Sequence, residues 1–292
     1  MISFSTLGTR SGLGNHLFQY AFLRTTAQRL GVQFYCPEWI GDFVFELNDS
    51  LERAGGNSSI SSEYVEPRNY TGLNKSAICI QDGTNIQGYF QTEQYFNKDH
   101  VREWYRFKED SLLNVRRKFE SIDFTKSCGL SIRLGDFVTN YGDLFYVPRL
   151  EYYFRALKLV KNQDNIIVFS DDISGAKVLL NKMGERFTFI DGYKPYEGIY
   201  LQSLCHDFIC SNSTYSWWGA WLNNRQDKVI VAPSEGPFRP GSVVKNHEFW
   251  PSDWQTTPAL RYGLDHRSVY KAKRFIQRVL NKTQRIFNKT TT

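Results

Sequence analysis

The sequence predicts an α/β protein built from two Rossmann-like units that face a cleft. Two observations lead to this prediction. A strand-like start over residues 2–7 runs through a glycine-containing loop into a helical segment. A longer alternation of short apolar strands with helical segments begins near Ser127. Repeated alternation of strand and helix is typical of a parallel, doubly wound sheet.

In the first unit, residues 8–14 predict a loop and residues 15–30 a helix with apolar positions at helical spacing. The Gly12-x-Gly14 spacing is similar to the start of a dinucleotide-binding fingerprint, but the third glycine is missing, so it is weak evidence for dinucleotide binding. Residues 48–76, rich in Ser, Asn and Gly, predict surface loops or an insertion. The other expected elements are strands at 77–80 and 86–90 and a helix over 100–121.

The second unit predicts strands at 129–133, 165–169, 188–190, 208–210 and 229–232, and helices at 150–160, 173–183, 199–205 and 217–223. Ligands of such sheets bind beyond the carboxyl ends of the strands, where the polar motifs of this half fall. We therefore divide the chain into a first α/β domain (1–125), a second, ligand-binding α/β domain (126–240) and a return segment with a tail (241–292).

The tail has apolar residues at helical spacing over 268–289, and its other faces are basic. This pattern predicts a basic C-terminal helix that contacts anionic lipid at a membrane surface. The alternative is a helix packed on the first domain with a solvated basic face. Eight of the Lys and Arg residues lie between 267 and 289, so they account for the net charge of +6. Without these residues the chain is slightly acidic, and no DNA- or RNA-binding motif occurs, so the sequence gives little support for nucleic-acid binding.

Composition bounds the class of protein. A chain of 292 residues with 41% hydrophobic content can form one large or two mid-sized domains. Its five cysteines include no Cys-x-x-Cys and lie in apolar settings, which predicts reduced, buried thiols. With no signal peptide and no apolar run of about 18 residues, we expect a soluble cytoplasmic protein, peripheral to the membrane if the tail binds lipid.

The most informative stretch is residues 209–222, which read ICSNSTYSWWGAWL. A strand runs into hydroxyl-bearing residues, and a Trp-rich segment follows. Hydroxyls and free amides at a helix start suit a phosphate, so Ser213, Thr214, Tyr215 and Ser216 are candidate phosphate-binding residues. The alternative is a Ser or Thr N-cap before a buried aromatic helix. The tryptophans themselves fit a core better than a sugar platform.

Four further motifs accompany this stretch, namely SGLGNHLFQYA at 11–21, GYFQTEQYF at 88–96, LSIRLGDF at 130–137 and VFSDD at 168–172. Together, in this order, the five resemble the α-1,2-fucosyltransferase family, whose members move L-fucose from GDP-fucose to a sugar hydroxyl. The resemblance runs from about Leu7 to about Trp254. It implies a GT-B-like fold, one-step displacement with inversion at the sugar, and no metal or other cofactor.

The third motif departs from the family pattern His-x-Arg-Arg-x-Asp. Ser131 stands at the His position and Leu134 at the second Arg position, while Arg133 and Asp136 are retained. The resemblance places Arg133 on the donor diphosphate, where a guanidinium can pair two phosphate oxygens. Asp136 positions Arg133 or acts as a base; positioning is favoured, because a carboxylate beside an arginine has a lowered pKa. The two replacements leave the exact donor sugar open.

Ser170, Asp171 and Asp172 follow a strand. Paired acids suggest a metal site, but acids at a helix start are commonly caps. We favour nucleoside contact or capping over metal binding.

Gly12 and Gly14 would let the backbone approach a ligand closely, and Asn15 opens a helix and could bond sugar or phosphate oxygens. His16 is a candidate for acceptor contact or proton transfer, although a lone histidine is more often structural. The sequence does not identify the catalytic base.

The sequence is compatible with three classes of function. The first is an inverting transferase that moves L-fucose to a glycan hydroxyl such as the 2-OH of a galactose-like residue, or a variant that uses a related GDP-6-deoxy sugar. The second is a non-catalytic protein that binds a glycan or a nucleotide sugar. The third is a membrane-associated scaffold in glycan assembly. The expected partners are a GDP-sugar and an oligosaccharide or lipid-linked acceptor.

Overall fold

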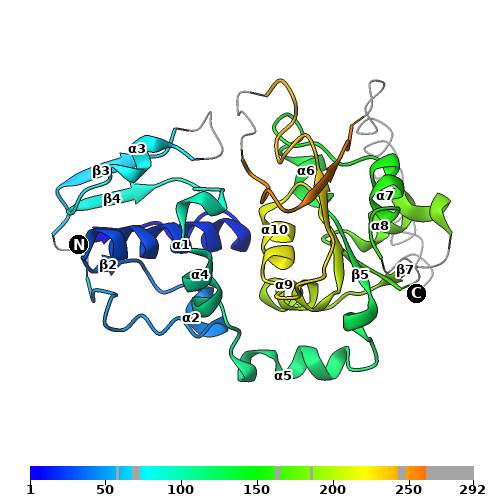
Figure 1. The fold of residues 1–292 in the computed structure, drawn as a ribbon, viewed down its shortest axis with the longest axis horizontal. Helices are drawn as coiled ribbons and strands as arrows, with labels where there is room; N and C mark the ends of the chain where they lie inside the picture. The colour runs from blue at the N-terminus through cyan, green and yellow to red at the C-terminus, as the bar shows by residue number, and fades with distance from the viewer. Residues whose placement is uncertain (57–58, 68–72, 162–164, 185–186, 243–247, 261–292) are drawn as a thin grey trace, which may run out of the picture.

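The computed structural model describes residues 1–56, 59–67, 73–161, 165–184, 187–242 and 248–260, and it forms two parallel sheets, one in each half of the chain (Figure 1). Helix α1 runs through the first half toward α10, which lies at the centre of the molecule, and α5 crosses from one half to the other. The first half contains β1 (Ile2–Ser3), α1 (Leu13–Leu30), β2 (Phe34–Tyr35), α2 (Ile40–Val44), β3 (Ser62–Val65), α3 (Lys75–Ile78), β4 (Thr84–Gln87), η1 (Glu93–Tyr95), α4 (Lys98–Trp104), α5 (Glu109–Lys118) and η2 (Phe124–Lys126), where η marks a 3-10 helix.

The first sheet has the order β2-β1-β4-β3 with every pair parallel. The helix predicted over 15–30 is confirmed as α1, which ends at Gly31 in the left-handed conformation (φ 66°) that glycine adopts without a Cβ clash. The strand predicted at 77–80 is wrong. Asn74 accepts a hydrogen bond from the Ser76 amide and starts a helical turn, α3, there instead.

Two further predictions in this half need correction. The helix predicted over 100–121 is divided into α4 and α5, because the amide of Lys108 bonds the Val44 carbonyl and Phe107 forms a bridge with Phe45. The described part of the segment 48–76 lies mostly at the surface, as predicted, but it contains the strand β3, and Asp49 and Glu52 accept hydrogen bonds from side chains of α1.

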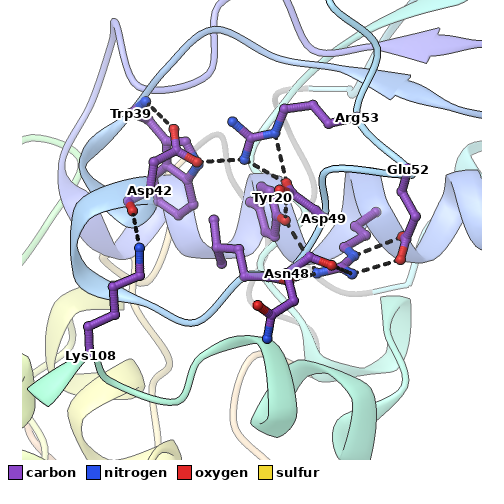
Figure 2. Close-up of polar contacts among 10 residues, drawn as sticks. Tyr20, Trp39, Asp42, Asn48, Asp49, Glu52, Arg53 and Lys108 are labelled. Carbon is purple, nitrogen blue, oxygen red and sulfur yellow. Dashed lines mark hydrogen bonds and ion pairs between the residues drawn. The ribbon is translucent and has the colours of Figure 1, made fainter.

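Figure 2 shows how that attachment is made. Arg53 pairs with Asp42 of the α2 segment at 2.6 Å and with Asp49 at 2.7 Å, and the hydroxyl of Tyr20, on α1, donates to Asp49 at 2.8 Å. Lys108 Nζ donates to the Asp42 carbonyl at 2.8 Å. Because Arg53 contacts carboxylates from both segments and Asp49 also bonds Tyr20, this network holds α1 against the α2 segment.

The second half contains β5 (Cys128–Ile132), α6 (Gly135–Thr139), α7 (Leu150–Leu157), β6 (Ile166–Ser170), α8 (Ile173–Leu180), η3 (Asn181–Met183), β7 (Phe187–Phe189), α9 (Pro195–Leu204), β8 (Asp207–Ile209), α10 (Thr214–Trp221), β9 (Ile230–Pro233) and β10 (Gln255–Thr257). The predicted alternation of strands and helices is confirmed here, with boundaries shifted by a few residues. The sheet order is β10-β9-β8-β5-β6-β7, all parallel. The strand β10 was not predicted, and it adds residues of the segment 241–292 to this sheet.

The largest core cluster spans both halves. Trp217 and Trp218 of α10 are fully buried, and their rings lie 4.6 and 4.8 Å from the ring of Phe18 on α1. The tryptophans are therefore core residues, as expected. A second cluster, which includes Leu130, Tyr152 and Val168, covers the other face of the second sheet.

The predicted basic helix at 268–289 lies outside the described residues. Within the described ranges, no helix combines the length and the hydropathy needed to cross a membrane. All five cysteines are free; four are buried as predicted, but Cys79 is exposed at the end of α3.

Candidate functional site

The candidate site lies where the second sheet reverses its strand order. From β5 the chain adds β6 and β7 on one side, then returns to place β8, β9 and β10 on the other. The crevice outside the carboxyl ends of two strands at such a switch point is the usual ligand site of an open α/β sheet. Here the two strands are β5, which leads to Arg133, and β8, which leads to the hydroxyl-rich residues 211–216.

Arg133 is held between two carboxylates. Its Nη2 donates to Asp136 at 2.8 Å, and its Nη1 lies 3.4 Å from Asp171. One third of the side chain remains exposed. A guanidinium that is oriented by two acids yet still reachable from solvent can pair an anionic ligand without first being reorganised.

The acids after β6 are occupied by contacts within the protein. Asp171 accepts a hydrogen bond from the Leu134 amide at 2.9 Å as well as facing Arg133. Asp172 caps α8 by accepting from the Gly175 amide at 3.0 Å, and its own amide donates to the Ser170 hydroxyl at 3.1 Å. This geometry matches the capping interpretation; the predicted nucleoside contact stays a prediction.

The serines around β8 form a buried hydroxyl cluster. Ser211 contacts Ser131 at 3.2 Å, Ser213 at 3.1 Å and Ser216 at 3.2 Å. Ser213 also caps α10 by accepting from the Ser216 amide at 3.2 Å. Ser131, which replaces the family histidine, is therefore part of this cluster. Ser216 is fully buried, so its hydroxyl faces the cluster rather than an open surface.

Thr214 and Tyr215 begin α10 and are both half-buried. The Tyr215 hydroxyl donates to the Pro195 carbonyl at 2.7 Å, and burial raises the pKa of Tyr215 well above its ordinary value, with the charge of Arg133 opposing the shift. Tyr215 therefore links α10 to the start of α9 on the side where Arg133 lies.

The loop before α1 meets this same region. Gly14 packs against the backbone of Thr214 and Tyr215, so the space it leaves is filled by α10. Gly12, by contrast, has open space around its Cβ position. Asn15 accepts a hydrogen bond from the Gln91 side-chain amide at 2.8 Å.

His16 is buried, and its Nε2 lies 2.8 Å from the carbonyl of Arg10. Burial lowers its pKa, although the contact with that carbonyl opposes the shift. This contact orders the loop 10–15, and the predicted role of His16 in acceptor contact or proton transfer stays a prediction.

Two helices begin at this site. Gly12 precedes α1 without a side-chain cap, and Ser213 precedes α10. First-turn amides have no partner within their helix and carry the positive end of the helix dipole. Together with Arg133, they make this crevice suited to an anion such as a diphosphate.

Sequence reasoning missed the side chains that connect β4 to α1. The Gln19 amide nitrogen donates to the Gly88 carbonyl at 2.9 Å, and its buried Oε1 has no partner among the described residues. Glu66, at the end of β3, accepts from the amides of Tyr89 and Phe90. The polar residues of the motifs at 11–21 and 88–96 could have indicated this connection, because Gln19 bonds the Gly88 carbonyl and Gln91 bonds Asn15.

Among the described residues, the motifs form no metal centre and do not line the hollow found beside β9. Within the described ranges, no group of three His, Cys, Asp or Glu side chains is arranged to hold a metal ion. A hollow of about 520 Å³ lies at the amino end of β9, lined by Arg102, Arg225, Lys228 and others, and contains none of the predicted site residues. The strand topology and the contacts of Arg133 define the site, and Arg133 does not line this hollow.

The chain has relatives among characterised sequences. The profile of Glycosyl transferase family 11 matches residues 62–254. An O-antigen biosynthesis glycosyltransferase from Escherichia coli, WbnK, is 30% identical over 181 residues, which cover 58% of this chain and 60% of the relative, less than two thirds of its length. An α-1,2-colitosyltransferase from Escherichia coli is 30% identical over 206 residues, covering 67% of this chain and 69% of the relative.

Solved structures share the fold. The α-1,6-fucosyltransferase NodZ, soaked with GDP-fucose, aligns with a TM-score of 0.51 at 11% identity, over 82% of this chain and 97% of that one. The apo form of POFUT1 aligns with a TM-score of 0.51 at 8% identity, over 79% and 97%. At these identities the likeness concerns the fold alone, and it confirms the predicted GT-B-like arrangement of two α/β units.

Proposed function

Because the chain belongs to glycosyltransferase family 11, we propose that it transfers L-fucose from GDP-fucose to a glycan hydroxyl, the 2-OH of a galactose-like residue, with inversion at the sugar. One observation carries this proposal: Arg133 lies at the strand-order switch point, oriented by Asp136 and Asp171 and still partly exposed. A diphosphate leaving group is the ligand that such a crevice suits best.

The proposed reaction is a single displacement. The acceptor oxygen approaches the anomeric carbon from the side of the first domain, opposite the diphosphate, while the bond to the β-phosphate breaks. Negative charge grows on GDP, and Arg133 and the first-turn amides of α10 offset it. No step is assigned to a metal, since Arg133 already supplies a fixed positive charge at the diphosphate.

A related GDP-6-deoxy sugar is the second candidate donor. Ser131 and Leu134 replace the His and Arg of the family motif, and one relative is named for colitose transfer. Both replacements are buried, Ser131 among hydroxyls and Leu134 among apolar side chains. A non-catalytic protein that binds nucleotide sugars is the other class that these replacements leave open.

The acceptor is an oligosaccharide or a lipid-linked glycan. The basic, amphipathic pattern of residues 268–289 supports a lipid-linked acceptor, because such a tail would be drawn to an anionic membrane surface.

A donor and acceptor screen tests the function. The purified chain is incubated with GDP-fucose and other GDP-6-deoxy sugars, each with galactose-terminated acceptors, and product linkage is read by NMR. We expect an α-linked deoxy sugar on one hydroxyl. Binding of GDP without turnover of any donor would instead favour the non-catalytic class, and neither binding nor turnover would reject the proposal.

A further inference from the structure

Glu66 is a buried carboxylate at the carboxyl end of β3, and the transfer proposed above gives it no role. Its Oε2 accepts hydrogen bonds from the amides of Tyr89 at 2.6 Å and Phe90 at 3.0 Å. The other oxygen, Oε1, accepts no hydrogen bond from the described residues and is not fully enclosed. One oxygen is therefore fixed in place, and the other can accept a proton from a group that approaches it.

Burial disfavours the charged form of this group. It raises the pKa of Glu66, and the two backbone amides oppose the shift without cancelling it. No charged side chain of the described part contributes to that shift, and the titratable neighbour that shares its field is Tyr64, on the same strand. Among the described carboxylates with a resolved change in pKa, Glu66 is the one whose pKa is raised. A carboxylate with a raised pKa is a stronger base.

The backbone facing Glu66 is built closely around it. Gly88 has a φ of 154°, and a Cβ there would come within 2.4 Å of the Glu66 Cβ. Phe90 adopts a φ of 51°, which is an uncommon and strained backbone conformation for a residue with a side chain. Such strain persists where the surrounding contacts impose it, and here Glu66 makes two of those contacts.

A chain of contacts connects Glu66 to the donor crevice. Gln19, on α1, bonds the Gly88 carbonyl, and Gln91 bonds Asn15 in the first turn of the same helix. Gly14, one residue earlier, lies against the start of α10. The segment after β4 is therefore connected, through the first turns of α1, to the start of α10 in the second domain. Tyr89, next to Gly88, is a large hydrophobic residue that is 48% exposed.

We propose that Glu66 is the general base of the transfer and that the exposed ring of Tyr89 forms the adjoining surface for a neutral acceptor sugar. The proposal rests on the transferase function above. An inverting displacement needs a group that removes the acceptor proton, and aromatic rings present an apolar face with polar edges that suits a sugar.

The step is balanced. The acceptor hydroxyl loses its proton to Glu66 Oε1, and its oxygen forms the new bond to the anomeric carbon. The bond from that carbon to the β-phosphate oxygen breaks, and its electron pair stays on GDP. The protonated Glu66 then releases its proton to water.

The variant Glu66→Gln separates this role from support of the loop. Its side-chain carbonyl can still accept both backbone hydrogen bonds, but it cannot take a proton. We expect kcat to fall by about 100-fold or more, the acid limb of the kcat/KM profile to disappear, and GDP affinity and melting temperature to be kept. Tyr89→Ala should raise the acceptor KM several-fold while kcat is largely retained.

Glu63→Gln is the matched control, because Glu63 lies on β3 just before Glu66, is exposed and, among the described residues, bonds only the Asn85 and Gln87 side chains. It should behave as wild type. Turnover of Glu66→Gln within a few-fold of wild type, with the acid limb unchanged, would overturn the inference. So would a loss of GDP affinity in step with turnover, since Glu66 would then only support the loop. If wild type itself transfers no GDP-sugar, the proposed function fails and this inference fails with it, whereas an active wild type with an active Glu66→Gln variant overturns this inference alone.

Discussion

Gly14, in the first turn of α1, lies directly against Thr214, in the first turn of α10: a Cβ on Gly14 would come within 2.6 Å of the Thr214 carbonyl carbon. The two helices belong to different halves of the chain, and their contact is continued by Phe18 against Trp217 and Trp218. The absence of a side chain at Gly14 thus lets both helix starts converge at one crevice.

Gly14→Ala should separate these helix starts. Because the clash is with backbone atoms, α1 must shift, and we expect a loss of about 1–3 kcal/mol in the free energy of unfolding, together with weaker GDP binding. Gly12→Ala is the matched control, since nothing lies within 4 Å of its Cβ position; its cost should be about 1 kcal/mol or less. Denaturant unfolding and calorimetry measure both. Equal behaviour of the two variants would show that the close contact is unimportant.

The alternation of strands and helices after Ser127 could be predicted because short, buried parallel strands read as continuous apolar runs. The first half was harder to predict. Its strands, such as β1 at Ile2–Ser3, are very short, and the break between α4 and α5 depends on Phe107 pairing with Phe45, which is distant in sequence. Local periodicity contains no information about such long-range pairs.

Leu134→Arg restores the family residue but should destabilise this chain. Leu134 is 1% exposed and belongs to the apolar cluster of the second sheet. A guanidinium in that apolar cluster would be buried and desolvated, so we expect a loss of about 3 kcal/mol or more. Leu134→Met, which conserves volume, should cost less than about 1.5 kcal/mol. A Leu134→Arg variant of wild-type stability that binds GDP more tightly would contradict this view of the position.

Chelation should leave turnover largely intact. Asp171 and Asp172, the adjacent acids that could suggest a metal site, are engaged by the Leu134 amide, Arg133 and the Gly175 amide. Initial rates with and without EDTA measure this directly. Activity that is lost on chelation and restored by Mn²⁺ or Mg²⁺ would assign these carboxylates to a metal instead.

In the site, as in the fold, features that depend on neighbouring residues could be predicted, and contacts between residues distant in sequence could not. The strand-end position of Arg133 and the cap at Ser213 follow from local sequence. The pairing of Ser131 with Ser211, and the use of Gly14 for helix contact rather than ligand contact, depend on residues about 80 and 200 positions apart. Glu66 was missed because no local pattern distinguishes a buried carboxylate from a solvated one.

Removal of the chain after Leu264 tests the tail. We expect the truncated protein to lose salt-sensitive binding to anionic vesicles, because eight Lys and Arg residues are removed, and to keep its activity on a short soluble acceptor. Vesicle co-sedimentation at low and high salt measures the first property. A truncated protein that unfolds, or a full-length protein that ignores vesicles at low salt, would assign the tail a structural role.

The most direct test of the central claim is the turnover of GDP-fucose by Arg133→Ala. We expect kcat to fall by about 100-fold or more, the cost of losing one preorganised group that stabilises the charge of the transition state, with the fold retained by circular dichroism. Arg117→Ala, at an exposed arginine of α5, should match wild type. Near-normal turnover in a well-folded Arg133→Ala variant would contradict the assignment of this crevice to the donor diphosphate.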